Sequence, residues 1–373
     1  TGIGSIYLSD LWAWPDPALT HEQRDAHLRA ICSQIAAILP EWCRPAAHPL
    51  ELGLRLHHEV ADRLANKPAG IPPLALAICI APFDAAIHDA VGKALGRSAF
   101  SFYEEDAPIP SADRYFAGGS AVRAIRAVLR PPVEALDAWW IVGAKDELPA
   151  AFEVPVCKHG YHCFKVKLLA KDVEEDIERS IEIYDAAVSL GCKNPRISLD
   201  SNEGNKNADE VLRYLQTLRD RRPDVFEALG YLEQPTGRDI TVHAYDWRET
   251  SRLKPILLDE GLTDLELLPL AREQGWSGLA LKTCKGHSFN LVAAAWAHEN
   301  GLLMAMQDLT NPGYAAIHSF LFAAHLPVIN GIELNSFQYT PAANEAWLPR
   351  LARLFQPTGG QHRLSTRGLI GLG

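Results

Sequence analysis

Five short runs between residues 163 and 282 decide the fold: CFKVKL (163–168), RISLD (196–200), GYLEQ (230–234), PILLD (255–259) and GLALK (278–282). Each run is mostly apolar, and each is followed by a segment in which apolar and polar residues recur at helical spacing. Buried strands that alternate with amphipathic helices are typical of a parallel sheet covered by helices. The sequence therefore predicts such a sheet in this part of the chain.

Two more runs continue the series, LLMAMQ (302–307) and VINGIEL (328–334). An eighth strand is expected between residues 114 and 142, near either RYFAG or WWIVG. Eight strand–helix units over this length predict a (β/α)₈ barrel. Asp172 is the expected N-cap of the helix that follows the first run.

The first 110 residues differ, because they carry helical patterns (21–39, 50–64 and 74–95) without regular strand alternation. We interpret them as a separate capping domain. The last stretch contains no further strand–helix unit and is expected to return to the cap. The predicted domains are thus a cap (1–110), a barrel (111–340) and a C-terminal segment (341–373).

Composition limits the classes of function. The formal net charge of −10 argues against nucleic acid and acidic membranes as partners. The most apolar stretch, 71–83, is interrupted by prolines and Asp84, so we expect a buried helix rather than a membrane span. Seven cysteines without C-x-x-C spacing predict reduced thiols in a cytoplasmic protein.

Three acids end three successive runs: Asp200, Glu233 and Asp259. Because the carboxyl ends of parallel strands meet at one face of a barrel, these groups should converge there. Converging carboxylates repel one another, and a divalent cation compensates them. All-oxygen ligation with open positions suits Mg²⁺. The alternative is that each acid caps the helix that follows it.

Three lysines accompany the acids. Lys165 and Lys167 lie two apart on one strand, so both side chains project to the same side, toward the barrel mouth. Neighbouring ammonium groups lower each other's pKa, which helps one of them act as a base near neutral pH. Lys282 ends a strand four places away and should face Lys167 across the ring. Two such lysines could remove a proton from one face of a carbon acid and return it to the other.

Further candidates for substrate contact or support lie beside these positions. Lys285 is the second choice, after Lys282, for the base that faces Lys167. Asp308 ends its run and could equally well cap the following helix. The full set of these secondary candidates is Asn202, Glu260, Lys285, Asp308 and Glu333.

At these residues the chain resembles the enolase superfamily, in particular the muconate lactonizing enzyme subgroup. The resemblance implies a modified (β/α)₈-type barrel under an N-terminal α+β capping domain, and an enolate stabilised by Mg²⁺. The subgroup's K-x-K pair, three metal ligands and sixth-strand lysine match Lys165, Lys167, Asp200, Glu233, Asp259 and Lys282. The chain opens at GIGS, with Ser5 where the family motif G-x-G-E has its Glu, so we expect the cap's N-terminal strands to be missing.

The resemblance implies an isomerase or lyase that takes the α-proton from a small carboxylate, and a homo-oligomer without nucleic-acid or membrane partners. A racemase or epimerase is the first expectation. A dehydratase or cycloisomerase with the same site is the alternative. The sequence also leaves open a metal-free barrel in which a lysine forms a Schiff base, and a barrel without catalytic function.

Overall fold

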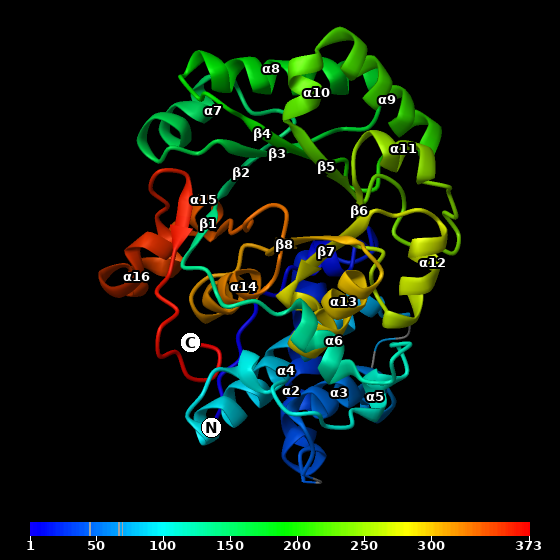
Figure 1. Ribbon diagram of the computed structural model, residues 1–373, viewed down its shortest axis with the longest axis vertical. Helices are drawn as coiled ribbons and strands as arrows, with labels where there is room; N and C mark the ends of the chain where they lie inside the picture. The colour runs from blue at the N-terminus through cyan, green and yellow to red at the C-terminus, as the bar shows by residue number, and fades with distance from the viewer. Residues whose placement is uncertain (45, 66–67, 69) are drawn as a thin grey trace.

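The structure is a computed structural model that describes residues 1–44, 46–65, 68 and 70–373. Its centre is a seven-stranded, wholly parallel sheet with the strands in chain order, which curls round on itself (Figure 1). Buried side chains fill its interior. The strands are β2 (Trp139–Val142), β3 (Cys163–Lys167), β4 (Arg196–Asp200), β5 (Leu229–Glu233), β6 (Ile256–Leu258), β7 (Gly278–Lys282) and β8 (Leu303–Gln307).

The run 328–334, where a strand was expected, joins the sheet through isolated bridges. Ile332 bridges Ala138, and Glu333 bridges Gln307 at the end of β8, both in parallel. The run 328–334 therefore links the two edges of the sheet without forming a regular strand. Of the two candidates for the expected eighth strand, WWIVG contains β2, whereas RYFAG forms turns after α5 (Pro110–Asp113). The predicted barrel is confirmed.

Helices cover the outside of the barrel, as the sequence pattern predicts. Asp172 is the N-cap of α8, and its carboxylate accepts hydrogen bonds from the backbone N–H groups of Glu174 and Glu175. The helices and turns between the strands are α7 (Ala150–Phe152), η2 (Glu153–Lys158), α8 (Val173–Ser189), α9 (Ala208–Arg221), α10 (Pro223–Ala228), α11 (Arg248–Leu253), η3 (Leu265–Leu267), α12 (Leu268–Glu273), η4 (Thr283–Lys285), α13 (His287–Glu299) and α14 (Tyr314–His325).

The N-terminal part packs against α13 and η4 of the barrel, and its described residues form helices but no strand. The cap is thus helical within the described part of residues 1–110. The elements before the barrel are α1 (Asp10–Ala13), α2 (His21–Trp42), α3 (Pro49–Arg63), α4 (Pro73–Leu95), η1 (Ala99–Ser101), α5 and α6 (Ala121–Val128).

Helix α4 is the core of this cap. It packs against α2, α3 and α13, and by length and composition it is the one described helix that could cross a membrane. Within its most apolar window, 61% is buried inside the protein, which is also what the core helix of a globular domain shows. These contacts agree with the expectation of a buried helix.

After α15 (Ser336–Tyr339), the C-terminal segment comprises η5 (Pro341–Trp347), α16 (Leu348–Phe355) and β9 (Gln361–Arg363). Strand β9 pairs antiparallel with β1 (Ala135–Asp137), just before the barrel begins. Beyond it, the backbone N–H of Leu372 donates to Asp89 of α4, and the N–H of Ile3 donates to the same carboxylate. The two termini therefore lie together on the cap (Figure 1).

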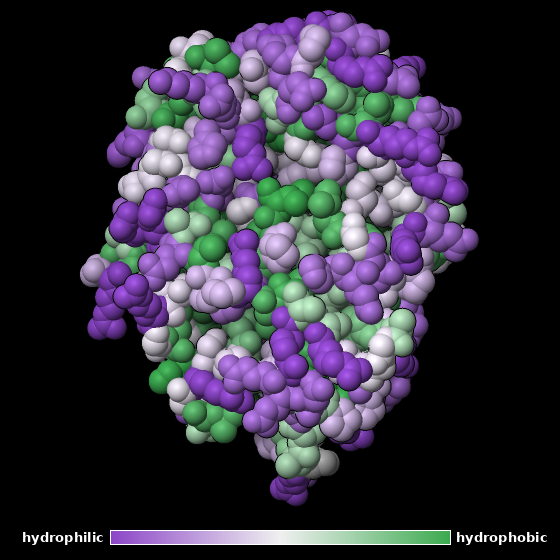
Figure 2. All heavy atoms as spheres, viewed as in Figure 1, coloured by the Kyte–Doolittle hydropathy of each residue, from purple (hydrophilic) through white to green (hydrophobic). Residues whose placement is uncertain are grey.

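The face shown in Figure 2 is mostly polar, with apolar residues gathered toward its centre. The barrel interior holds its own small apolar cluster of Trp139, Cys163, Tyr231, Leu257 and Ala305. Trp139 thus fills the barrel core. All seven cysteines are free thiols, as the sequence predicts.

Candidate active site

The three acids lie at the carboxyl ends of three adjacent strands and are buried. Asp200 and Glu233 are register partners on β4 and β5, and Asp259 directly follows β6. Their residues are 3%, 1% and 1% exposed, respectively. None of them caps a described helix, since Asn207 caps α9 and Asp264 caps η3. The helix-cap alternative is therefore not what the structure shows.

Lys165 lies among the carboxylates. Its ammonium pairs with Glu233, lies 3.3 Å from Asp200 Oδ2 and lies 3.2 Å from Glu333 Oε2. Phe164 and Val166 point outward into the main core, so the alternation on β3 is as expected. Burial would lower the pKa of Lys165, but the surrounding carboxylates outweigh burial and raise it well above its ordinary value. The expected lowering is not found at this lysine.

Lys167 reaches the same cluster from its outer side. Its ammonium pairs with Asp200 and lies 3.2 Å from Asn202 Oδ1, while its side chain is 29% exposed. Asn202 has a left-handed backbone (φ 47°), and its N–H donates to Asp200 Oδ1 at 2.9 Å. Burial acts to raise the pKa of Asp200, but Lys167 and Lys165 together hold it below its ordinary value.

Two further lysines lie on the other side, at Asp259. Lys282, at the end of β7, pairs with Asp259 Oδ2 and is buried. Lys285, the second choice to Lys282, ends the buried turn η4. Its ammonium donates to the backbone oxygen of Asp259 at 2.6 Å and lies 3.2 Å from Asp259 Oδ1. Lys282 and Lys167 are therefore separated by four strand positions, on opposite sides of the acids.

The pKa values at this second pair differ in direction. Burial acts to lower the pKa of Lys282, but Asp259 and Glu260 more than offset this and raise it. The pKa of Lys285 is lowered by burial, with Asp259 acting in the opposite sense. Burial also acts to raise the pKa of Asp259, which Lys282 and Lys285 hold below its ordinary value.

The remaining predicted residues lie around the cluster. Glu260 accepts a hydrogen bond from the indole N–H of Trp12 at 2.7 Å, and burial and the Asp259 charge raise its pKa to about 7. Glu333 accepts from the side chain of Asn335 as well as facing Lys165. Asp308 binds the backbone N–H groups of residues 310, 311 and 335, so it holds two loops together and does not cap a helix.

Three residues that the sequence reasoning missed complete the cluster. The Gln234 side-chain oxygen accepts the N–H groups of Asp259 and Gly261, and so fixes the chain where β6 ends. Gln307 donates to Glu233, and the ring of Trp12 lies 4.9 Å from the Lys282 ammonium. Gln234 and Gln307 stand at strand ends like the predicted acids, which was a usable signal. Nothing in the sequence marks Trp12.

The donor set fits a divalent cation in charge and chemistry. The four lysines pair with four carboxyl groups, and two further buried acids, Glu260 and Asp308, lie beside them, so the cluster has a formal excess of two negative charges. Burial, together with the neighbouring carboxylates, raises the pKa of Glu233 well above its ordinary value even though Lys165 opposes the shift. Among the described residues, however, the group of possible ligands whose atoms all lie within 4.8 Å of one another is Asp137, His162 and Cys163, at the opposite ends of the strands. At the three predicted ligands, Asp200, Glu233 and Asp259, lysine ammonium groups lie between the carboxylates.

Comparison with known proteins supports the fold. No family model matches the chain, and no curated protein matches its sequence. Among solved structures, a muconate lactonizing enzyme is similar over 100% of this chain and 87% of its own, with 18% identity and a TM-score of 0.66.

Two further solved structures are similar to the same degree. The muconate lactonizing enzyme from Pseudomonas fluorescens, solved with muconolactone, is similar over 100% of this chain and 84% of its own, with 19% identity and a TM-score of 0.66. A mandelate racemase/muconate lactonizing protein from Herpetosiphon aurantiacus is similar over 96% and 86%, with 19% identity and a TM-score of 0.64. The chain therefore has the capped-barrel fold of the muconate lactonizing enzymes.

Proposed function

We propose that this protein is an enzyme of the enolase superfamily that removes the α-proton of a small carboxylate. One observation carries the proposal: lysines approach a buried cluster of carboxylates from opposite sides, Lys167 at Asp200 and Lys282 at Asp259. The shared fold with muconate lactonizing enzymes supports it. A barrel without catalytic function has no need of four lysines and six acids in one buried place.

Asp200, Glu233 and Asp259 would hold Mg²⁺. When bound there, the cation would stabilise the negative charge that develops on the substrate carboxylate as the proton leaves. The carboxyl groups of this chain would be relieved of their excess negative charge. The lysines would then exchange some of their carboxylate partners for the substrate.

Within this site, Lys167 is proposed as the base. It is the lysine of the cluster whose side chain is part exposed, and Asn202 and Asp200 orient its ammonium. Lys282 would act from the opposite face. If it exchanges a proton with the same carbon, the enzyme is a racemase or epimerase.

A second outcome, elimination or lactonisation, uses the same residues and has its own support. Lys282 is buried, paired with Asp259 and covered by the Trp12 ring, and its pKa is raised because the nearby acids outweigh the effect of burial. A lysine held as a cation favours chemistry with one base. Solved structures of this fold include muconate cycloisomerases.

The test is incubation of a pool of small carboxylates with the enzyme and Mg²⁺ in D₂O, followed by mass spectrometry. A compound that gains one mass unit (a single deuterium) only with Mg²⁺ supports proton abstraction, and loss of water indicates a dehydratase. Lys167→Met should abolish either product. Lys206→Met is the matched control, because that lysine is 74% exposed and lies outside the site. Turnover without a divalent cation, or turnover by Lys167→Met, would contradict the proposal.

The free thiols support the further proposal of a cytoplasmic location. The homo-oligomer stays a prediction.

A further inference from the structure

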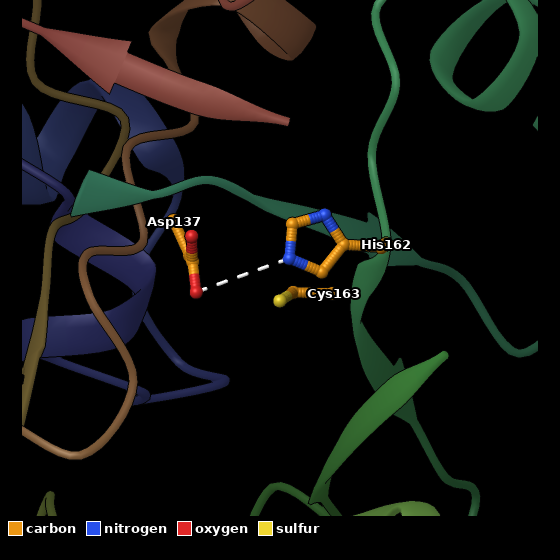
Figure 3. A group of neighbouring side chains, drawn as sticks. All are labelled: Asp137, His162 and Cys163. Atoms are coloured by element: carbon orange, nitrogen blue, oxygen red, sulfur yellow. Dashed lines mark ion pairs between the residues drawn. The ribbon is translucent and has the colours of Figure 1, made fainter. Parts of the chain in front are cut away.

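A second group of possible metal ligands lies at the amino-terminal ends of the barrel strands. Asp137 ends β1 just before the barrel, and His162 and Cys163 lie at the start of β3 (Figure 3). One ligand atom from each residue lies within 4.8 Å of the other two. The His162 Nε2 atom lies 3.9 Å from Asp137 Oδ2.

This group differs in chemistry from the acids at the other end. A thiolate, an imidazole and a carboxylate are the ligands of zinc and similar transition metals, whereas Mg²⁺ prefers oxygen alone. Three protein ligands with the fourth position open to water satisfy a tetrahedral ion. Cys163 is buried in the barrel interior, while the side chains of His162 and Asp137 are 33% and 30% exposed. A cation can therefore reach the thiol from the solvent side.

Neighbouring residues hold the ligands in place. The side-chain amide of Gln361 donates to Asp137 Oδ1 at 3.2 Å, and such a second hydrogen bond fixes a ligating carboxylate. A Cβ atom at Gly360, where φ is 71°, would lie 2.6 Å from His162 Nδ1. The glycine thus leaves the space that the imidazole ring occupies.

Two groups oppose a cation here. Hydrogen bonds to Asp137 and Cys163 raise the pKa of His162 to about 10, so a metal must displace the imidazole proton, and Arg196 competes for Asp137. The guanidinium of Arg196 lies 3.2 Å from Asp137 Oδ2, the oxygen that faces His162. Arg196 has other partners, because it also donates to the backbone oxygen of Ile329 at 2.9 Å and lies 5.7 Å from the Trp139 ring. It can therefore keep its place while it gives up the Asp137 oxygen, and its charge should weaken metal binding without preventing it.

We propose that Asp137, His162 and Cys163 form a binding site for a zinc-like divalent cation at the floor of the barrel. The site would tie β1, the start of β3 and, through Gln361, the C-terminal segment together. It shares no residue with the proposed magnesium site and lies at the other ends of the same strands.

Cobalt titration of the protein, with Mg²⁺ in excess, tests this. Binding should give one Co²⁺ per chain with a thiolate-to-cobalt charge-transfer band. Cys163→Ser should lose the band, and so should His162→Gln, whose part-exposed position guards against a folding failure. Cys157→Ser removes an exposed thiol outside the site and should keep the charge-transfer band. Asp200→Asn should also keep the band, which separates this site from the proposed activity.

Arg196→Met gives a second, independent test. Removing the competing charge should tighten Co²⁺ binding by up to about fivefold, the size of one partly exposed ion pair. Absence of a charge-transfer band, a band that survives in Cys163→Ser, or weaker binding by Arg196→Met would each overturn the proposal.

Discussion

Replacing Asp259 by Asn should destabilise the protein strongly, even though the two side chains have the same shape. Asp259 is the carboxylate partner of both Lys282 and Lys285, and all three residues are buried. Asparagine keeps one side-chain oxygen acceptor but no charge, so both lysines lose the counter-ion at their ammonium groups, and Lys285 is left with neutral acceptors such as the backbone oxygens of residues 259 and 280. Breaking a buried ion pair by removing one partner costs about 3–5 kcal/mol, which is about a hundred- to several-thousand-fold in the unfolding equilibrium.

The destabilisation should also depend on pH. Burial already lowers the pKa of Lys285, and Asp259 offsets part of that effect. In Asp259→Asn the pKa of Lys285 falls further, so the unfolded chain binds the proton more tightly than the folded one. Stability of the variant should therefore rise with pH, from the lowered folded pKa up to the ordinary lysine value of about 10.4.

The assay is urea unfolding followed by tryptophan fluorescence, at about pH 7 and at about pH 9.5. Asp200→Asn is the matched control. There Lys165 keeps Glu233 and Glu333, and Lys167 is part exposed, so the loss should be about 1–2 kcal/mol. Equal losses for the two variants, or a loss in Asp259→Asn that is the same at both pH values, would refute this account of the buried charges.

Three further predictions concern the rest of the fold. Asp172→Ala should lower the free energy of unfolding by about 1 kcal/mol in urea, because it removes the observed N-cap of α8. Gly53→Ala should lower the free energy of unfolding by more than about 2 kcal/mol, because its Cβ would lie 2.0 Å from Ser288 Oγ where the cap meets the barrel. Gly118→Ala is the control and should leave the free energy of unfolding unchanged, because no atom lies within 4 Å of its Cβ. Burial lowers the pKa of His362 to about 4, so its folded form binds a proton less readily than the unfolded chain and stability is lost as pH falls from about 6.5 toward 4. His362→Gln should remove about one proton from the slope of stability against pH over that range, and an unchanged slope would contradict the assignment.

The barrel was predictable because its strands are buried on both faces. Such strands appear as continuous apolar runs, and their ends are marked by charged residues such as Asp200, Glu233 and Lys282. Closure was less visible, since residues 328–334 join the sheet by two bridges only. The apolar pattern of a buried run is the same whether it forms a full strand or only two bridges, so the sequence does not distinguish the two. The choice between RYFAG and WWIVG stayed open for a related reason, as both are short runs with aromatic residues.

The strand positions of the candidate site residues were predictable, but the partners of each side chain were not. Strand alternation places Lys165 and Lys167 on one side, yet it does not say which carboxylates surround each ammonium. That depends on contacts between residues far apart in sequence, such as Lys165 with Glu333. Trp12 lies 248 residues from Glu260, and no local pattern connects them.

The surroundings of the four lysines bear on the choice between the two proposed outcomes. Lys165 is enclosed by three carboxylates, and Lys285 meets three oxygen acceptors, so neither has a free position for a substrate. Lys282 lies between Asp259 and the ring of Trp12, a setting that stabilises its positive charge. Lys167 alone combines partial exposure with a single carboxylate partner. Proton exchange that stops in Lys167→Met but continues in Lys282→Met would therefore identify a one-base enzyme. Loss of exchange from one face in each variant would instead establish a racemase.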